Sequence, residues 1–180
     1  MVGRAEEADQ IDGGAGSNDK VTYYDDRWNG GQRGIVANLT TGVIIDGFGR
    51  KDQVSNVEWV LGTKYNDSFV GSANRDVFIG DGGVDSYDGG GNPNDSGEGD
   101  RIQFNWNFSD LPQHGIVVDL AKASGQIADD GYGNTETCTG IEGIVGSQQN
   151  DVIKGDNGMN LFAGADGQDT MTGRGGINEY

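Results

Sequence analysis

The sequence lacks the residues that most often cross-link a small protein. It contains one cysteine, Cys138, and one histidine, His114. A disulfide within the chain is therefore excluded, and so is a zinc site built from cysteine and histidine ligands. No apolar run approaches the length of a transmembrane helix, so we expect no membrane insertion. The first ten residues contain no apolar segment typical of a secretory signal, which leaves a cytoplasmic location, excision from a larger protein, or export by another route open.

Basic residues are also scarce. Lys and Arg total 12 against 29 Asp and Glu, and the formal net charge is −17. Binding to nucleic acid needs a basic face, so we expect no nucleic-acid partner. An anionic membrane surface is disfavoured for the same reason. The charge favours cations as partners.

Large apolar residues are few: Leu, Ile, Val and Phe number 37 of 180 residues, whereas glycine alone numbers 34. Glycine loses the most backbone entropy on folding, and a charged chain with so few apolar residues lies close to the composition of disordered proteins. Folding therefore needs a further source of free energy. Oxygen-ligated hard cations can supply it, and carboxylates are suitable ligands for them.

Glycine recurs at every ninth position in two segments of the chain. In most of these rows an Asp or Asn follows the glycine by five positions, and an apolar or aromatic residue follows two positions later. The row glycines are Gly62, Gly71, Gly80 and Gly89, then Gly146, Gly155, Gly164 and Gly173. The polar residues five positions on are Asp67, Asp76 and Asp85, then Asp151, Asn160, Asp169 and Asn178.

Some rows are less regular. The row that begins at Gly89 is interrupted, and if residues 92–96 form an insertion, Asp100 and Ile102 restore the register. Near the N-terminus, two looser rows contain Asp9 and Asp19.

The rows GDGGVDSYD at 80–88 and GADGQDTMT at 164–172 resemble the G-G-x-G-x-D-x-U-x repeat of the haemolysin-type calcium-binding (RTX) family. Several consecutive rows share one register, which makes the resemblance specific. It implies an all-β fold, a right-handed parallel β-roll or β-solenoid, with calcium ions between its loops. It also implies type I secretion and a secreted, extracellular protein.

The repeat has a physical interpretation of its own. The first part of each row, Gly-rich or polar, suits a tight loop, and the last part suits a short strand with one inward side chain. Two rows then form one coil, and loops two rows apart stack about 4.8 Å apart. Facing aspartates would repel each other at that distance unless a cation lay between them.

We therefore predict several Ca²⁺ ions, about four or more, between stacked loops. The predicted pairs are Asp67 with Asp85, Asp76 with Asp100, Asp151 with Asp169, and Asn160 with Asn178. The last pair is neutral, so it should be the weakest site or empty. Asp9 and Asp19 are further candidate ligands, and the Gly-rich backbone should add carbonyl oxygens at Gly62, Gly71, Gly80, Gly82, Gly146, Gly155 and Gly164.

A longer period lies above the nonapeptide. GIVANL at 34–39 reappears as GIVVDL at 115–120, and VEWVLG at 57–62 reappears as IEGIVG at 141–146. The offset is slightly larger for the second of these, which indicates a short insertion or deletion between them. We expect a single domain, 1–180, made of two duplicated units near 9–88 and 89–180. Each unit should contain wider β rungs, with first-unit strands at 35–39, 43–46 and 57–61 that continue the solenoid.

Other chemistry has little support in the sequence. No common catalytic motif is present, so we expect no enzyme. His114 is interpreted as a solvated loop residue and Cys138 as a small buried hydrophobe. Two aromatic clusters are interpreted as core or cap of the wider rungs, with a sugar-stacking platform as the alternative. They are Tyr23, Tyr24 and Trp28, then Phe104, Trp106 and Phe108.

The leading hypothesis is a calcium-binding module that folds outside the cell, where calcium is plentiful. It would be a structural or secretion-assisting part of a larger secreted protein, with a monomer favoured. Two alternatives stay open: a calcium-dependent carbohydrate-binding or adhesin module with an extracellular polysaccharide partner, and the non-catalytic repeat region of a polysaccharide-modifying enzyme, protease or lipase.

Overall fold

A computed structural model describes residues 7–91, 99–106, 111–176 and 178–179. The predicted insertion at 92–96, Phe108 and Tyr180 lie outside these residues. Within them, no helix is long and apolar enough to cross a membrane. The chain forms short strands, mostly of the length that the nonapeptide leaves after its loop.

The first unit contains nine strands and one short 3₁₀-helix among the described residues. They are β1 (Gln10–Asp12), β2 (Lys20–Thr22), η1 (Tyr24–Trp28), β3 (Val36–Asn38), β4 (Val43–Ile45), β5 (Lys51–Ser55), β6 (Trp59–Leu61), β7 (Ser68–Val70), β8 (Val77–Ile79) and β9 (Ser86–Asp88). The second part contains β10 (Arg101–Gln103), β11 (Val117–Asp119), β12 (Ile127–Asp129), β13 (Thr137–Thr139), β14 (Gly143–Val145), β15 (Val152–Lys154), β16 (Asn160–Ala163), β17 (Thr170–Thr172) and β18 (Asn178–Glu179).

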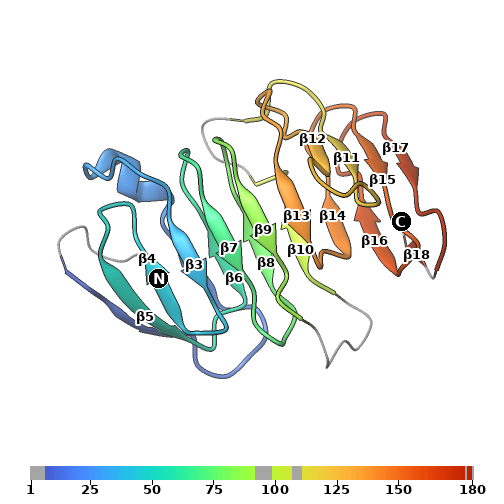
Figure 1. The fold of residues 1–180 in the computed structure, drawn as a ribbon. Coiled ribbons are helices and arrows are strands. Elements are labelled where there is room, and N and C mark those ends of the chain that lie inside the picture. The colour runs from blue at the N-terminus through green and yellow to red at the C-terminus, as the bar shows by residue number, and fades with distance from the viewer. Residues whose placement is uncertain (1–6, 92–98, 107–110, 177, 180) are drawn as a thin grey trace.

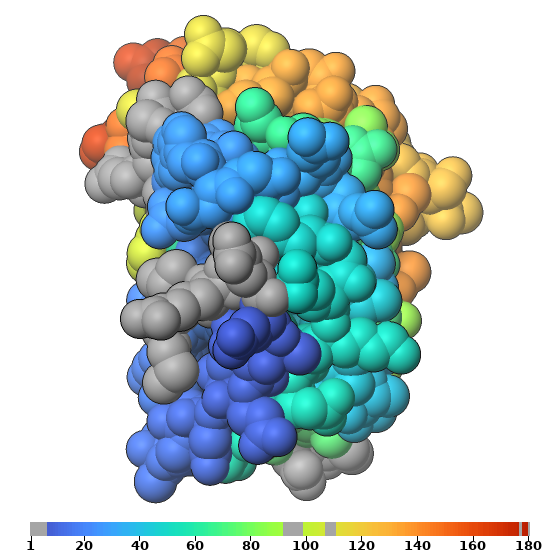
Figure 2. Space-filling view, turned by 90° about the vertical axis from the view of Figure 1, so that its left-hand side faces the viewer, coloured from blue at the N-terminus to red at the C-terminus, as the bar shows by residue number. Residues whose placement is uncertain are grey.

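Successive rows alternate between two faces of a parallel β-roll (Figure 1). One face is a seven-stranded sheet in the order β18-β16-β14-β10-β8-β6-β2, and the other consists of β1-β5-β4-β3-β7-β9-β13 followed by β12-β11-β15-β17. Val60 pairs with Phe78, and Phe69 pairs with Tyr87, so the paired strands belong to rows that are two apart. The predicted all-β parallel roll is confirmed. The two ends of the chain lie at opposite ends of the roll, and Figure 2 shows the N-terminal end, with its first rows in blue.

The core is a single column of side chains between the two faces. The middle residue of nearly every strand points inward, and Val60, Phe78 and Ile144 have no exposed surface. The rings of Phe69 and Tyr87 stack with centroids 5.2 Å apart. Most rows thus bury one large side chain, worth about 2 kcal/mol, whereas Val77, Phe78 and Ile79 are all buried and Met171 is only partly buried. A core of this width is thin, so the fold still needs an additional source of stability.

The inserts join the same roll but differ in one respect from the expectation. In the first insert β4 runs antiparallel to both β3 and β5, and in the second β12 runs antiparallel to β11. The reason is the short connection: Gly42, at φ 68°, lies in the tight turn between β3 and β4. A hairpin turn permits only antiparallel pairing. The outer strands of each insert still pair in parallel with repeat strands, β3 with β7 and β11 with β15.

The two inserts occupy equivalent places. β5 joins β1 and β13 joins β9, each in parallel and on the same face of the roll. Val54 in β5 and Cys138 in β13 are both buried in the core cluster. The longer period of the sequence therefore relates residues that have the same environment in the two halves.

Three non-glycine residues at the second position of a row have left-handed backbone angles: Asp81 at φ 68°, Ala165 at φ 68° and Arg174 at φ 60°. This conformation costs a non-glycine residue about 1–2 kcal/mol. Glycine at the fourth position, as at Gly83 with φ 114° and Gly167 with φ 124°, adopts it without that penalty.

Replacing Ala165 by Gly should raise the free energy of unfolding by about 0.5–1 kcal/mol, because relief of the strain exceeds the entropy that glycine adds to the unfolded chain. Urea unfolding in saturating calcium measures the free energy of unfolding of the variant and of the wild type. Ala163→Gly, in strand β16, is the control and should lower stability by a similar amount. A destabilised Ala165→Gly variant would contradict the assignment of strain.

Candidate metal centre

The repeat carboxylates lie at the two edges of the roll, where the loops stack. On one edge the backbone N–H of Asp67 donates to Oδ1 of Asp85 at 2.7 Å, and the N–H of Asp151 donates to Oδ1 of Asp169 at 3.0 Å. On the other edge the N–H of Asp76 donates to Oδ1 of Asp100 at 2.7 Å. Each predicted Asp pair is therefore brought together by stacking of its loops.

Three of these carboxylates also close their own loops. Oδ2 of Asp67 accepts the N–H of Thr63 at 2.7 Å, Oδ2 of Asp76 accepts the N–H of Ser72 at 2.6 Å, and Oδ2 of Asp151 accepts that of Ser147 at 2.8 Å. The donor is in each case the residue after the row glycine, four positions before the Asp. This contact accounts for the fixed spacing between glycine and aspartate in the sequence.

The row glycines are required because the carboxylate lies over them. A methyl group on Gly62, Gly80, Gly146 or Gly164 would collide with Oδ2 of the aspartate five positions later. Gly71 meets the carbonyl of Gly89, and Gly155 meets the Asn160 amide. Gly82 has open space around it, with its nearest neighbour, the Lys64 carbonyl, at 3.9 Å.

Four acids of the inserts lie in the same two columns, and sequence reasoning missed them. Asp9 donates its N–H to Oδ1 of Asp52 at 2.8 Å, and Asp19 donates to Oε2 of Glu58 at 3.0 Å. The second unit repeats both contacts, with Asp85 donating to Oε1 of Glu136 at 3.1 Å and Asp100 to Oε2 of Glu142 at 2.9 Å. The signal in the sequence was an acid at 52 and 58 that recurs at 136 and 142, with the offset that relates VEWVLG to IEGIVG.

We call these two columns the acid ladders. The first contains Asp9, Asp52, Asp67, Asp85, Glu136, Asp151 and Asp169, and the second contains Asp19, Glu58, Asp76, Asp100, Glu142, Asn160 and Asn178. Asp9 and Asp19, the further candidate ligands of the loose N-terminal rows, lie at the N-terminal ends of the two ladders.

Burial makes the charged form of these acids costly. It raises the pKa of Asp76 to about 6 and, with the charge of Asp130, the pKa of Asp85 to about 7. Burial and the charge of Asp85 raise the pKa of Asp67 well above its usual value. For Glu136, burial together with Asp85 and Asp130 raises the pKa to about 10. The folded ladders therefore hold protons more tightly than separate surface carboxylates do.

The neutral pair Asn160 and Asn178 shows which oxygens gather between two stacked loops. Nδ2 of Asn160 donates to Oδ1 of Asn178 at 2.8 Å, to the Gly158 carbonyl at 2.9 Å and to the Gly173 carbonyl at 3.0 Å. An amide nitrogen thus lies among oxygens of two stacked loops. Side-chain and carbonyl oxygens of this kind are the ligands that calcium prefers, so the donor set fits the ion.

Side chains alone do not complete a metal site. Among the described residues, no group of three or more His, Cys, Asp or Glu side chains could hold a metal ion. A site between stacked loops with two carboxylates therefore needs backbone carbonyls for the rest of its coordination shell, as the Gly158 and Gly173 carbonyls beside Asn160 illustrate.

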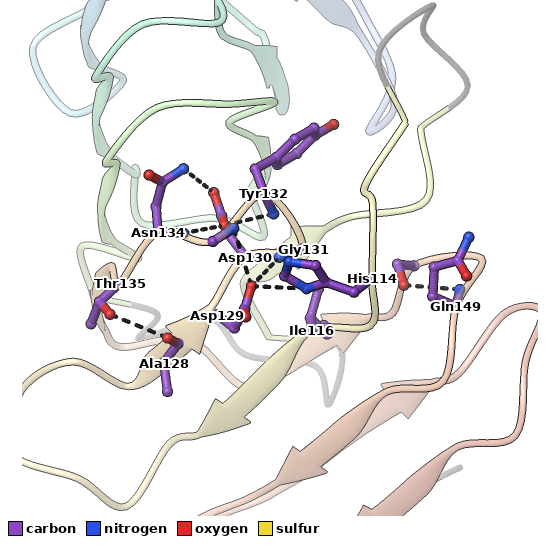
Figure 3. A network of polar contacts seen from close by, with 12 residues as sticks. His114, Ile116, Ala128, Asp129, Asp130, Gly131, Tyr132, Asn134, Thr135 and Gln149 are labelled. Atoms are coloured by element: carbon purple, nitrogen blue, oxygen red, sulfur yellow. Dashed lines mark hydrogen bonds and ion pairs between the residues drawn. The ribbon is translucent and has the colours of Figure 1, made fainter.

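The other candidate residues have structural roles. Cys138 is 3% exposed, and burial raises the pKa of its thiol to about 12, so it is a buried hydrophobe as predicted. His114 is exposed, and its Nδ1 lies 3.4 Å from Oδ1 of Asp129 (Figure 3). The exposed side chain agrees with a solvated loop residue.

The aromatic clusters mostly pack within the fold. Tyr23 and Tyr24 are buried, whereas Trp28 is 60% exposed. The Arg27 guanidinium lies 4.1 Å from the ring centroids of both Tyr24 and Trp28. In the other cluster the Lys20 ammonium lies 3.9 Å from the Trp59 ring centroid and 4.6 Å from that of Trp106.

Stacked Gly-rich loops with facing carboxylates on both edges of a parallel roll define the class: a calcium-binding β-roll. Comparison with family models agrees. The model of the RTX calcium-binding nonapeptide repeat matches in four copies, at residues 61–94 and 144–179. The chain therefore contains RTX repeats, which bind Ca²⁺, and four copies fit several ions. Comparison with curated proteins gives no match.

In calcium-free buffer we expect the roll to be more stable at about pH 5 than at about pH 8. The folded state holds the protons of Asp76 and Asp85 with pKa values of about 6 and 7, against 3.8 for an ordinary Asp. The stabilisation is thus fully present below pH 3.8 and is lost as the pH rises through 6 to 7. Each group contributes about 1.4 kcal/mol for each pH unit by which its pKa in the folded state exceeds its ordinary pKa.

Far-UV circular dichroism in chelator at the two pH values measures this effect as the folded fraction of the chain. Saturating calcium should remove it, because calcium competes with protons for the same oxygens. A chelated protein that is more stable at the higher pH would show that the buried carboxylates do not govern the pH dependence.

Replacing Asn160 by Asp should add one bound calcium ion, because the charge would replace the amide donor among the same oxygens. Native mass spectrometry in calcium counts the ions. Asn157→Asp, an exposed residue of the same loop, is the matched control and should leave the count unchanged. An equal count for Asn160→Asp and the wild type would refute the inference that this position resembles a cation position.

Proposed function

We propose that this protein is a structural module that folds when it binds calcium in the extracellular medium. The observation that carries the proposal is the pairing of buried carboxylates along both edges of the roll, as between Asp67 at 3% exposure and Asp85 at 2%. Burial of like charges is strongly unfavourable unless a counter-charge accompanies them. At neutral pH the empty ladders therefore oppose folding, and the filled ladders favour it.

The thin core makes this coupling effective. The few large apolar side chains buried in each row leave little surplus over the entropy of ordering a Gly-rich chain. Calcium binding then supplies folding free energy directly, because the site forms only in the folded state. Each divalent ion between two loops also offsets two negative charges of a chain that carries −17.

This coupling suits a protein that crosses membranes unfolded and folds afterwards. Calcium is scarce inside cells and plentiful outside them, so the same chain would be unfolded before export and rigid after it. We accordingly propose that the module is a secretion-assisting, non-catalytic part of a larger secreted protein, as the RTX repeats suggest. The ligands of the proposed sites are the Asp residues of the repeats named above, with carbonyls of the row glycines.

Calcium is the partner that the proposal names. A sugar-binding platform has less support, because Tyr23 and Tyr24 are buried and Trp106 packs beside Lys20 and Trp59. We propose that the protein is a monomer.

Circular dichroism during a calcium titration at about pH 7.5 tests the proposal. The far-UV spectrum should change from disordered to β over a cooperative range of calcium concentration. Magnesium at the same concentration should have little effect, since it is smaller and gives up its water reluctantly. The same β content in chelator and in calcium would overturn the folding mechanism.

A further inference from the structure

The acid ladder on the first edge does not end where the first repeat block ends. Strand β13 of the second insert pairs in parallel with β9, and Thr137 lies opposite Ser86. Glu136 therefore follows Asp85 in the ladder, at the place where a repeat would have supplied the next Asp. Its Oε1 accepts the Asp85 N–H at 3.1 Å, as the Asp85 carboxylate does for Asp67.

Three carboxylates are buried together at this junction. The exposed fractions are 2% for Asp85, 0% for Asp130 and 1% for Glu136. Their charges act on one another, because Asp85 and Asp130 are the charged groups that most affect Glu136. Among the described residues, none of the ion pairs of Lys, Arg or His reaches any of the three.

One oxygen in the cluster lacks a donor. Oε2 of Glu136 is buried without a hydrogen-bond partner. The two neighbouring carboxylates do have hydrogen-bond donors. Asp85 accepts the Tyr87 hydroxyl at 3.2 Å, and Asp130 accepts the N–H groups of Tyr132 and Asn134 (Figure 3). A buried carboxylate oxygen without a partner costs several kcal/mol, so it needs a ligand that the protein itself does not supply.

In the first unit a protein group donates a hydrogen bond to the carboxylate at the equivalent position. Asp52 is the counterpart of Glu136 in the longer period, and its Oδ2 accepts the Tyr23 hydroxyl at 2.9 Å. The residue that matches Tyr23 in the second unit, with the offset that relates GIVANL to GIVVDL, is Phe104, which has no hydroxyl. The second unit thus has a longer acid and no phenol donor, and the free oxygen follows from these two differences.

We propose that Glu136 and Asp85 together bind a divalent hard cation, calcium in the extracellular medium, at the junction of the first repeat block with the second insert. Asp130 adds negative charge beside the ion, and backbone carbonyls complete its coordination. Glu136 and Asp130 lie outside the segments that match the repeat family. The ion would tie the insert to the repeat block and so join the two halves of the roll. The inference rests on the proposed calcium binding.

Glu136→Gln tests the proposal, because the amide keeps an oxygen acceptor for the Asp85 N–H but removes the charge. Native mass spectrometry of the full chain in calcium should count one ion fewer than for the wild type. Asp129→Asn is the matched control: it makes the same charge change in the same insert, at a partly exposed residue, and should keep every ion. A Glu136→Gln variant with the wild-type count would overturn the proposal.

The ion count of the wild type separates the junction site from the proposed function. If the wild type binds no calcium, the proposed function fails, whereas a normal wild-type count with no change in the variant refutes only the junction site. A second variant covers the case in which Glu136→Gln does not fold. Glu136→Asp keeps the charge but shortens the side chain, and it should weaken one ion about tenfold or more in a calcium titration. Unchanged affinity at every ion would also overturn the proposal.

Discussion

The structure depends on the placing of like-charged carboxylates inside its edges. In several rows the aspartate lies over its own glycine, and Asp67, Asp76 and Asp151 accept the N–H of the residue after it, while the loop two rows away stacks against it. The same geometry that makes the loop compact therefore removes the carboxylates from water. Such an arrangement is stable only when protons or metal ions neutralise part of the charge, and this requirement links the fold to calcium.

The glycine content follows from that arrangement. A side chain at Gly62 or Gly164 would occupy the space of the carboxylate, and a side chain at Gly83 would press against the backbone of Tyr65 in the neighbouring loop. The glycines make the chain flexible when it is unfolded and closely stacked when it is folded. Under the proposed function, bound ions supply free energy that a wider core would otherwise provide.

The inserts give the roll its second level of organisation. They continue both acid ladders through Asp52, Glu58, Glu136 and Glu142, although none of these belongs to a regular nonapeptide row. They also connect the halves: Asp81 in a repeat loop lies 3.5 Å from Arg27 of the first insert and accepts the hydroxyl of Tyr132 in the second at 3.2 Å. The strained backbone at Asp81 accompanies this pair of contacts.

The sequence by itself determined the nonapeptide register, the alternation of loop and strand, and the pairing of Asp67 with Asp85 or Asp151 with Asp169, because these depend on local spacing that one coil repeats in the next. The longer duplication was visible for the same reason. The antiparallel course of β4 and β12 was decided only in the tertiary structure, since period-two alternation looks alike in both directions. The place of Glu136 beside Asp85 was also hidden, because a contact between residues 51 positions apart depends on how the insert returns to the roll.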